Sequence, residues 1–160
     1  MARNEWYSPA EVVEPARRVM GGIDLDPASC PAANEVVRAV DFYTIRDDGL
    51  KQRWRGRVWL NPPYDRFAPK FIAKFEQSFS LGEVSAGCLL LGVHHITTKW
   101  FGCLLSLDPI FCLPNRRLQF SGVTAQPMHG SVILGIGVEK EKFEEEFRSF
   151  GAILASPTVG

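Results

Sequence analysis

The sequence of 160 residues lacks any apolar run as long as the roughly 20 residues that a membrane-spanning helix needs. Its N-terminus, Met-Ala-Arg-Asn-Glu-Trp, has no apolar core of the kind found in secretory signal peptides. Internal repeats, low-complexity tracts and obvious linkers are also missing. These absences predict a single globular domain, residues 1–160, that has no association with a membrane.

Ligands for a metal ion are scarce in the sequence. No two of its four cysteines form a Cys-x-x-Cys pair, and its three histidines are too few and too scattered to indicate a metal centre. We therefore expect no metal, and we expect the thiols to be reduced core residues of a cytoplasmic protein. The cysteines are Cys30, Cys88, Cys103 and Cys112, and the histidines are His94, His95 and His129.

An excess of positive charge is absent too, since the formal net charge is zero. This balance argues against a protein that covers nucleic acid by bulk electrostatic attraction. The charges are nevertheless unevenly placed: basic residues from Lys51 to Arg57 surround Trp54, whereas glutamates from Glu139 to Glu146 lie near the end. A local basic face is compatible with DNA binding and equally with a solvated surface.

Helical and strand patterns alternate along most of the chain, which predicts an α/β protein with a mostly parallel central sheet flanked by helices. The first helix is expected to have Ser8 as its N-cap and Pro9 as its first residue, and to end at Gly21-Gly22. Further helices are predicted at 67–79, 98–105 and 141–150. Strands are predicted at 23–26, 58–60, 86–93, 110–113, 117–120, 131–138 and 152–155, with a weaker segment at 36–43.

The motif Asn61-Pro62-Pro63-Tyr64 directly follows an apolar strand. Its two prolines fix φ and remove two backbone donors, so the carbonyl groups here are not consumed by a helix or a ladder. The Asn61 side-chain oxygen and the Pro62 carbonyl then form a pair of acceptors beside the Tyr64 ring. This arrangement suits a flat heterocycle with an exocyclic amine. A plain proline-rich turn is the alternative interpretation.

Two acidic segments also follow predicted strands or turns: Asp26-Pro27-Ala28-Ser29 and Asp47-Asp48-Gly49. Ligands of open α/β sheets bind beyond the carboxyl ends of strands, where a carboxylate can accept a hydrogen bond from a ribose hydroxyl or an amino group. Each segment alone could instead be a helix cap or a turn. Their order ahead of the Asn61 motif favours a ligand site.

Taken together, these segments make the chain resemble the phage-type DNA N6-adenine methyltransferase family. The resemblance spans nearly the whole chain and implies a Rossmann-like methyltransferase fold with a reversed final strand. It also implies S-adenosylmethionine as cofactor, DNA as substrate and adenine N6 as the methylated atom, in the cytoplasm of a bacterial host of a phage or prophage. The segments that carry it are 5–9, 24–29, 43–44, 47–50, 56–64, 116–120 and Ser131. The loop 26–31 departs from typical methyltransferases because it contains no glycine.

The resemblance also implies residue roles. The predicted catalytic residues are Asn61, Pro62, Pro63 and Tyr64. The predicted cofactor contacts are Trp6, Tyr7, Ser8, Pro9, Asp24, Asp26, Pro27 and Ala28, together with Asp47 or Asp48. The predicted DNA contacts are Arg57, Arg116 and Arg117, for which solvated loop charge is the alternative. With little sequence beyond the core sheet, loops are expected to recognise a short DNA site, with a homodimer as one way to extend it.

Two other functions stay open at this stage. The same acceptor pair would serve a methyltransferase of another planar amine or amide, such as cytosine N4, an RNA base or a protein glutamine. Cytosine enzymes more often begin the motif with serine, so Asn61 favours adenine. The second alternative is a catalytically silent module that binds DNA or a host protein, which the retention of the whole motif disfavours.

Overall fold

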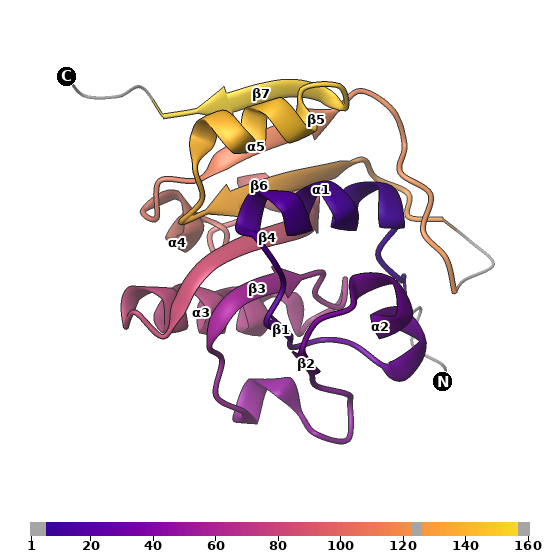
Figure 1. Cartoon of the computed structure of the whole chain (residues 1–160), viewed down its shortest axis with the longest axis vertical. Helices are drawn as coiled ribbons and strands as arrows, with labels where there is room; N and C mark the ends of the chain where they lie inside the picture. The colour runs from indigo at the N-terminus through magenta and orange to yellow at the C-terminus, as the bar shows by residue number, and fades with distance from the viewer. Residues whose placement is uncertain (1–5, 123–125, 157–160) are drawn as a thin grey trace.

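The computed structural model describes residues 6–122 and 126–156, and these form one mixed seven-stranded sheet with helices on both faces (Figure 1). The strand order across the sheet is β2-β1-β3-β4-β6-β5-β7. The strands are β1 (Leu25–Asp26), β2 (Asp41–Phe42), β3 (Gly56–Leu60), β4 (Val84–Gly92), β5 (Ile110–Pro114), β6 (Ser131–Ile136) and β7 (Gly151–Ala155). No helix of the described residues is long and apolar enough to cross a membrane.

The sheet divides into a parallel and an antiparallel half. The pairs β1–β2, β1–β3 and β3–β4 are parallel, whereas β4–β6, β5–β6 and β5–β7 are antiparallel. The prediction of a mostly parallel sheet is therefore wrong. A parallel pair of strands needs a crossover connection, which is usually a helix. The neighbouring strands β5 and β6 are joined by residues 115–130, and the described part of this connection contains no helix. The chain therefore returns antiparallel.

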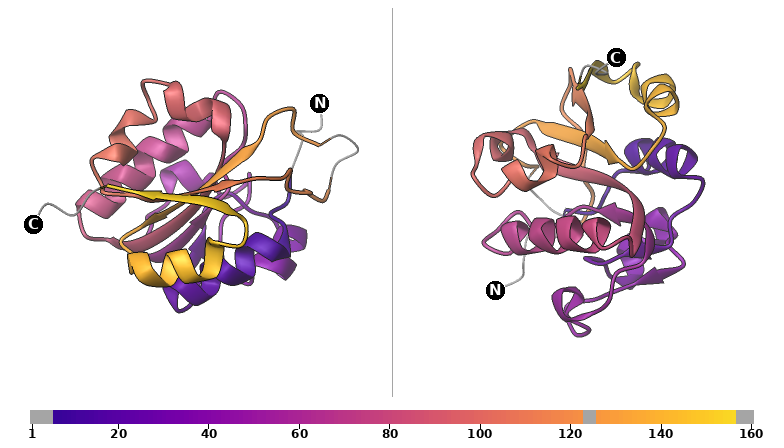
Figure 2. Two further views of the ribbon diagram at one scale, coloured as in Figure 1. Left: turned by 90° about the horizontal axis from the view of Figure 1, so that it is seen from above. Right: turned by 90° about the vertical axis from the view of Figure 1, so that its left-hand side faces the viewer.

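Helices cover both faces of the sheet. On one face lie α1 (Ala10–Met20), α2 (Pro31–Val37) and α5 (Lys140–Phe147), and on the other lie α3 (Ala68–Ser80) and α4 (Gly102–Leu105), as Figure 2 shows. Side chains of β4 alternate between the two cores: Cys88 and Leu90 pack with the α1 side, while Leu89 and Leu91 pack with the α3 side. A strand buried on both faces therefore reads as one continuous apolar run.

Several predicted elements have different bounds in the structure. The first helix ends as expected, with Gly21 in the left-handed conformation, but its N-cap is Pro9 and not Ser8. The helix expected at 98–105 is reduced to α4, and residues 117–120 form no strand. The weak segment at 36–43 splits between α2 and β2, because Arg38 adopts a left-handed conformation that ends α2.

The order of strands places a crevice between β1 and β3. The connection from the carboxyl end of β1 leads to β2 on one side, and the connection from the carboxyl end of β3 leads to β4 on the other side. The two connections therefore run in opposite directions. The short 3-10 helix η1 (Gly49–Lys51) packs against the loop after β1. A Cβ atom at Gly49 would lie 2.1 Å from the Pro27 carbonyl oxygen, so only glycine allows this close approach.

Candidate functional site

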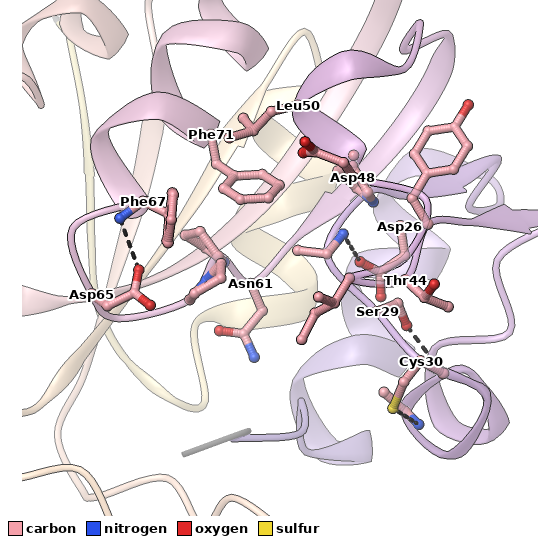
Figure 3. A pocket seen from close by; sticks show the side chains of 18 of the residues that line it. Asp26, Ser29, Cys30, Thr44, Asp48, Leu50, Asn61, Asp65, Phe67 and Phe71 are labelled. Carbon is pink, nitrogen blue, oxygen red and sulfur yellow. Dashed lines mark hydrogen bonds between the residues drawn. The ribbon is translucent and has the colours of Figure 1, made fainter. Parts of the chain in front are cut away.

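A cavity of about 840 Å³ lies beyond the carboxyl ends of β1 and β3 (Figure 3). This volume falls within the roughly 300–1,000 Å³ typical of ligand pockets. The walls come from segments that are far apart in the sequence, namely residues 6–8, 26–30, 43–45, 48–51 and 61–65, with Ala33, Phe67, Lys70 and Phe71. The three segments singled out in the sequence thus meet around one cavity.

The Asn61 side chain is held from one side only. Its amide nitrogen donates to the Trp6 carbonyl at 2.8 Å and to the Ser8 hydroxyl at 3.1 Å. No described residue donates a hydrogen bond to its oxygen Oδ1. In Figure 3 the side chain projects between the loop that carries Asp65 and the residues that follow β1. The oxygen is therefore available as an acceptor for a ligand.

The rest of the motif continues this wall. Pro62 is buried, and none of the described residues donates to its carbonyl group. The Tyr64 ring lies 5.0 Å from the Trp6 ring and 6.4 Å from the Phe120 ring, measured between centroids. Burial raises the pKa of the Tyr64 hydroxyl well above its usual value. At neutral pH this side chain is thus an uncharged aromatic surface and not a base.

Asp26 is the buried acid of the cavity. It ends β1, is only 3% exposed, and accepts one hydrogen bond at 3.2 Å from the Ala28 backbone N–H. Burial raises the pKa of Asp26 to about 7, although the hydrogen bond from the Ala28 N–H acts in the opposite direction. A carboxyl group this poorly solvated gains from any donor that a ligand presents.

The two acids of the 43–51 turn have different positions. Asp47 is exposed, does not line the cavity, and accepts from the backbone N–H and the hydroxyl of Thr44 at 2.8 and 2.9 Å. Asp48 lines the cavity and lies 3.4 Å from the Lys51 ammonium. Leu50 and Phe71 form an apolar patch near Asp48 (Figure 3). Of the two candidates, the structure brings Asp48 to the site.

Asp24, Arg57 and Pro9 lie outside the cavity walls. The guanidinium of Arg57 donates two hydrogen bonds of 2.8 Å to the two carboxylate oxygens of Asp24, and the Arg57 backbone N–H donates a third. This pairing lowers the pKa of Asp24. Pro9 serves as the N-cap of α1. The geometry therefore ties the predicted cofactor residue Asp24 and the predicted DNA residue Arg57 to each other.

The other two arginines predicted to contact DNA also lie away from the cavity. Arg116 is paired with Glu11 of α1, and its guanidinium lies 5.6 Å from the centroid of the Phe150 ring. Arg117 is exposed and is not part of the cavity wall. Glu5 of the N-terminal motif lies outside the described residues.

The chain matches a known protein family along nearly its whole length. The model of the family described as DNA N-6-adenine-methyltransferase (Dam) matches residues 1–154. The chain belongs to the Dam family. One similar protein is the DNA N-6-adenine-methyltransferase of Escherichia phage T1, which is 38% identical over 82 residues, covering 48% of this chain and 33% of that protein. This Dam-family chain thus spans about a third of the length of the curated relative it matches.

Some cavity residues of this Dam-family chain were missed from the sequence. Phe71 belongs to a stripe of phenylalanines at helical spacing, a pattern that indicates core packing, yet it both packs in the core and lines the cavity. Ser29 and Cys30, which directly follow the predicted cofactor contacts Asp26 to Ala28, also line it. Lys70, which closely follows the Asn61 motif, lines the cavity as well.

His129, which is distant in the sequence from the adjacent pair His94 and His95, lies beside His94 in the Dam-family structure. The His94 ring centroid is 3.9 Å from that of His95 and 4.2 Å from that of His129. Burial and the neighbouring histidines lower the pKa of His95 to about 4, so this ring is neutral at pH 7. Within residues 6–122 and 126–156, no group of acidic, cysteine and histidine side chains has the geometry to hold a metal ion.

Proposed function

We propose that this Dam-family chain transfers a methyl group from S-adenosylmethionine to N6 of adenine in DNA. The observation that carries the proposal is the pair of acceptors at the cavity, Asn61 Oδ1 and the Pro62 carbonyl, to which no described residue donates. Two acceptors on consecutive residues of the cavity wall match the two hydrogens of an exocyclic amine. The Tyr64 ring next to them offers a surface on which a purine can stack.

The cavity has the chemistry that the cofactor requires. S-adenosylmethionine, when bound, supplies a methyl group on a positively charged sulfonium. Asp26 and Asp48 present carboxylates for amino or hydroxyl groups, and Leu50 with Phe71 presents an apolar surface for a base. The cavity also lies at the switch point of strand order, where open α/β sheets bind their ligands. The directions of β6 and β7, each antiparallel to β5, support a Rossmann-like methyltransferase sheet with reversal at its end.

Asn61 and Pro62 would activate the amine by accepting its hydrogens. The lone pair of adenine N6 is delocalised into the ring, and two acceptors placed out of the ring plane draw the nitrogen toward a tetrahedral geometry that localises this pair. The contribution of the chain is positioning and electrostatic stabilisation. The protonated Tyr64 hydroxyl excludes this residue as a base. Because N6 lies within the duplex, the base must be rotated out, and stacking on Tyr64 offsets part of that cost.

Methyl transfer from labelled S-adenosylmethionine to matched substrates tests the proposal. A duplex that contains adenine should acquire the label, and mass spectrometry of the digested nucleosides should identify N6-methyladenine. A duplex without adenine, an RNA of the same sequence and a protein substrate should stay unlabelled. Label on N4 of cytosine or on glutamine would show that the substrate is another planar amine or amide and not adenine. Calorimetry that detects no cofactor binding would favour a silent module.

The rim of the cavity offers two cations for the DNA backbone. The charged groups of Arg66 and Lys70 lie 5.1 and 5.5 Å from the centroid of the Phe67 ring, and Lys70 and Phe67 line the cavity. Neither cation forms an ion pair with a described acid, whereas Arg57 and Arg116 both do. Unpaired cations beside an extruded base are well placed for its flanking phosphates.

Replacing Arg66 or Lys70 by alanine is therefore expected to weaken DNA binding to a similar extent for every sequence. Each phosphate contact that is lost should lower the slope of log Kd against log salt concentration by about 1. Fluorescence anisotropy at several salt concentrations measures both quantities. Lys142→Ala, an exposed lysine on α5, is the matched control and should leave the slope unchanged. Unaltered slopes for both rim variants would remove this contact from the proposal.

A further inference from the structure

The N-terminal residues 6–8 contact Asn61 directly, and we call them the strap. Ser8 is 5% exposed, and its hydroxyl oxygen lies 2.9 Å from the indole nitrogen of Trp59 and 3.1 Å from Asn61 Nδ2. The Trp6 carbonyl accepts from the same Nδ2 at 2.8 Å. Both hydrogens of the Asn61 amide thus have an acceptor on the strap. Ser8 was expected to cap α1, but α1 has no side-chain cap, so its hydroxyl is engaged in the site instead.

The strap is itself tied to the scaffold at two further points. The Tyr7 backbone N–H donates to the Ser121 carbonyl at 3.0 Å, and the two residues form an isolated antiparallel bridge. The Trp59 indole, from the buried strand β3, donates to Ser8. Because Trp59 is fully buried, its N–H fixes the position of the Ser8 oxygen. A strap anchored in this way can fix the conformation of the residue that it contacts.

We propose that the strap sets the orientation of the Asn61 carboxamide and that Ser8 is a positioning residue. A carboxamide has nearly the same shape after a half-turn, which exchanges its oxygen and its nitrogen. The Trp6 carbonyl can only accept, so it faces the NH₂ group, and the Ser8 oxygen accepts from Trp59. Only this orientation directs Oδ1 away from the strap. After a half-turn, two acceptors would oppose each other at 2.8 Å.

The same contacts select an amide over a carboxylate at position 61. An aspartate there would place a negatively charged oxygen against the Trp6 carbonyl, with no hydrogen to donate. The isosteric change Asn61→Asp therefore conflicts with the strap even though it preserves an acceptor toward the cavity. This inference rests on the proposed function only in its kinetic consequence, because the orientation itself is a property of the cofactor-free chain.

The orientation can be measured without any activity. In ¹H–¹⁵N spectra, the side-chain NH₂ signals of Asn61, assigned by their disappearance in Asn61→Asp, should exchange slowly with solvent. In Ser8→Ala one of the two acceptors is lost, and the exchange of this NH₂ group should accelerate by about fivefold, since a hydrogen bond contributes ~1 kcal/mol and a tenfold factor corresponds to 1.4 kcal/mol. Ser78→Ala is the matched control, a serine 6% exposed on α3. Equal exchange rates of the Asn61 NH₂ group in the unaltered protein, Ser8→Ala and Ser78→Ala would overturn the proposal.

The kinetic consequence is a loss of kcat rather than of affinity. Ser8→Ala should lower kcat for methyl transfer to duplex DNA by about 10²-fold, the cost of a small misplacement of a reacting group. The affinity for S-adenosylmethionine, measured by calorimetry, should change by less than about threefold in this variant. A variant that retained kcat but lost cofactor affinity would make Ser8 a cofactor contact instead.

Asn61→Asp completes the test. It should also lose about 10²-fold or more in kcat at neutral pH, and full activity of this variant would show that the strap does not select the amide. Thermal unfolding of each variant shows whether it is folded at the assay temperature. If the unaltered chain does not methylate DNA at all, the proposed function fails, while the exchange measurement still decides the orientation.

Discussion

Replacing Asn61 by alanine is expected to lower kcat for methyl transfer by about 10²–10³-fold, the usual cost of removing one preorganised hydrogen-bonding group from a transition state. The expectation follows from the geometry at the cavity, where Oδ1 is an acceptor without a described donor. Only the Pro62 carbonyl would remain to accept a hydrogen of the amine. The change should affect kcat more than the affinity for DNA, because base stacking on Tyr64 is retained.

A single-turnover assay with labelled S-adenosylmethionine measures this loss directly. Asn115→Ala, an exposed asparagine beyond β5, is a matched control and should retain the rate of the unaltered chain. Cofactor binding by the Asn61→Ala variant should also be measured, because the Asn61 side chain forms part of the same cavity wall. Undiminished methyl transfer by Asn61→Ala would refute the role assigned to the acceptor pair.

Asp26→Asn should raise the stability of the folded protein at high pH and should weaken the binding of the cofactor. Burial raises the pKa of Asp26 in the folded protein to about 7, from an ordinary value of 3.8. The folded protein therefore binds this proton more tightly than the unfolded chain does. The resulting stabilisation is fully present below about pH 4 and is lost as the pH rises through 7. The difference between the two pKa values corresponds to about 4 kcal/mol at most.

Asparagine cannot ionise, so the variant should avoid this loss. At pH 8 its free energy of unfolding should exceed that of the unaltered protein by a few kcal/mol, on the order of 2–4, while at pH 4 the two proteins should differ little. Urea denaturation across this pH range measures the difference. Asp41→Asn, at an exposed acid on β2, is the matched control. A constant difference across the range would contradict the buried ionisation.

The same substitution should weaken cofactor binding. A hydrogen bond to a charged group contributes about 1.5–3 kcal/mol, so losing the carboxylate should raise the Kd for S-adenosylmethionine by about 10–150-fold. In the unaltered protein, affinity should increase from pH 6 to pH 8 as Asp26 ionises, and binding near pH 7 should release a proton. Calorimetry in two buffers of different ionisation enthalpy detects this release. Binding that is independent of pH would place Asp26 outside the cofactor contacts.

The elements that the sequence predicted well are those with a strong local pattern. Helix α3, with its stripe of phenylalanines, and strand β4, with its apolar run, lie close to where the sequence predicted them. The spacing of the buried residues differs between helices and strands, so each pattern indicates one kind of element. The family was recognised for a related reason. The Asn61 motif and the acidic segments are contiguous in the chain, and their order can be read without knowledge of contacts.

Directions of side chains and of strands were the parts that the sequence did not reveal. Ser8 followed by Pro9 has the local pattern of a helix cap, yet a tryptophan 51 residues away engages the Ser8 hydroxyl. Arg57 was predicted to contact DNA, and its ion-pair partner Asp24 could not be recognised from the sequence because it lies 33 residues earlier. Asp47 and Asp48 are neighbours in the chain, but only one lines the cavity.

By itself, the sequence determined which chemical groups this protein has and in which order they occur, and this was enough to predict an amine-binding motif and to recognise a family. The tertiary structure alone decided which acid faces the cavity, which arginines are neutralised, how half of the sheet is paired and which partners the Asn61 amide has. The physical reason is that composition and period are local properties, whereas a hydrogen-bond partner is chosen among residues that only folding brings within about 3 Å.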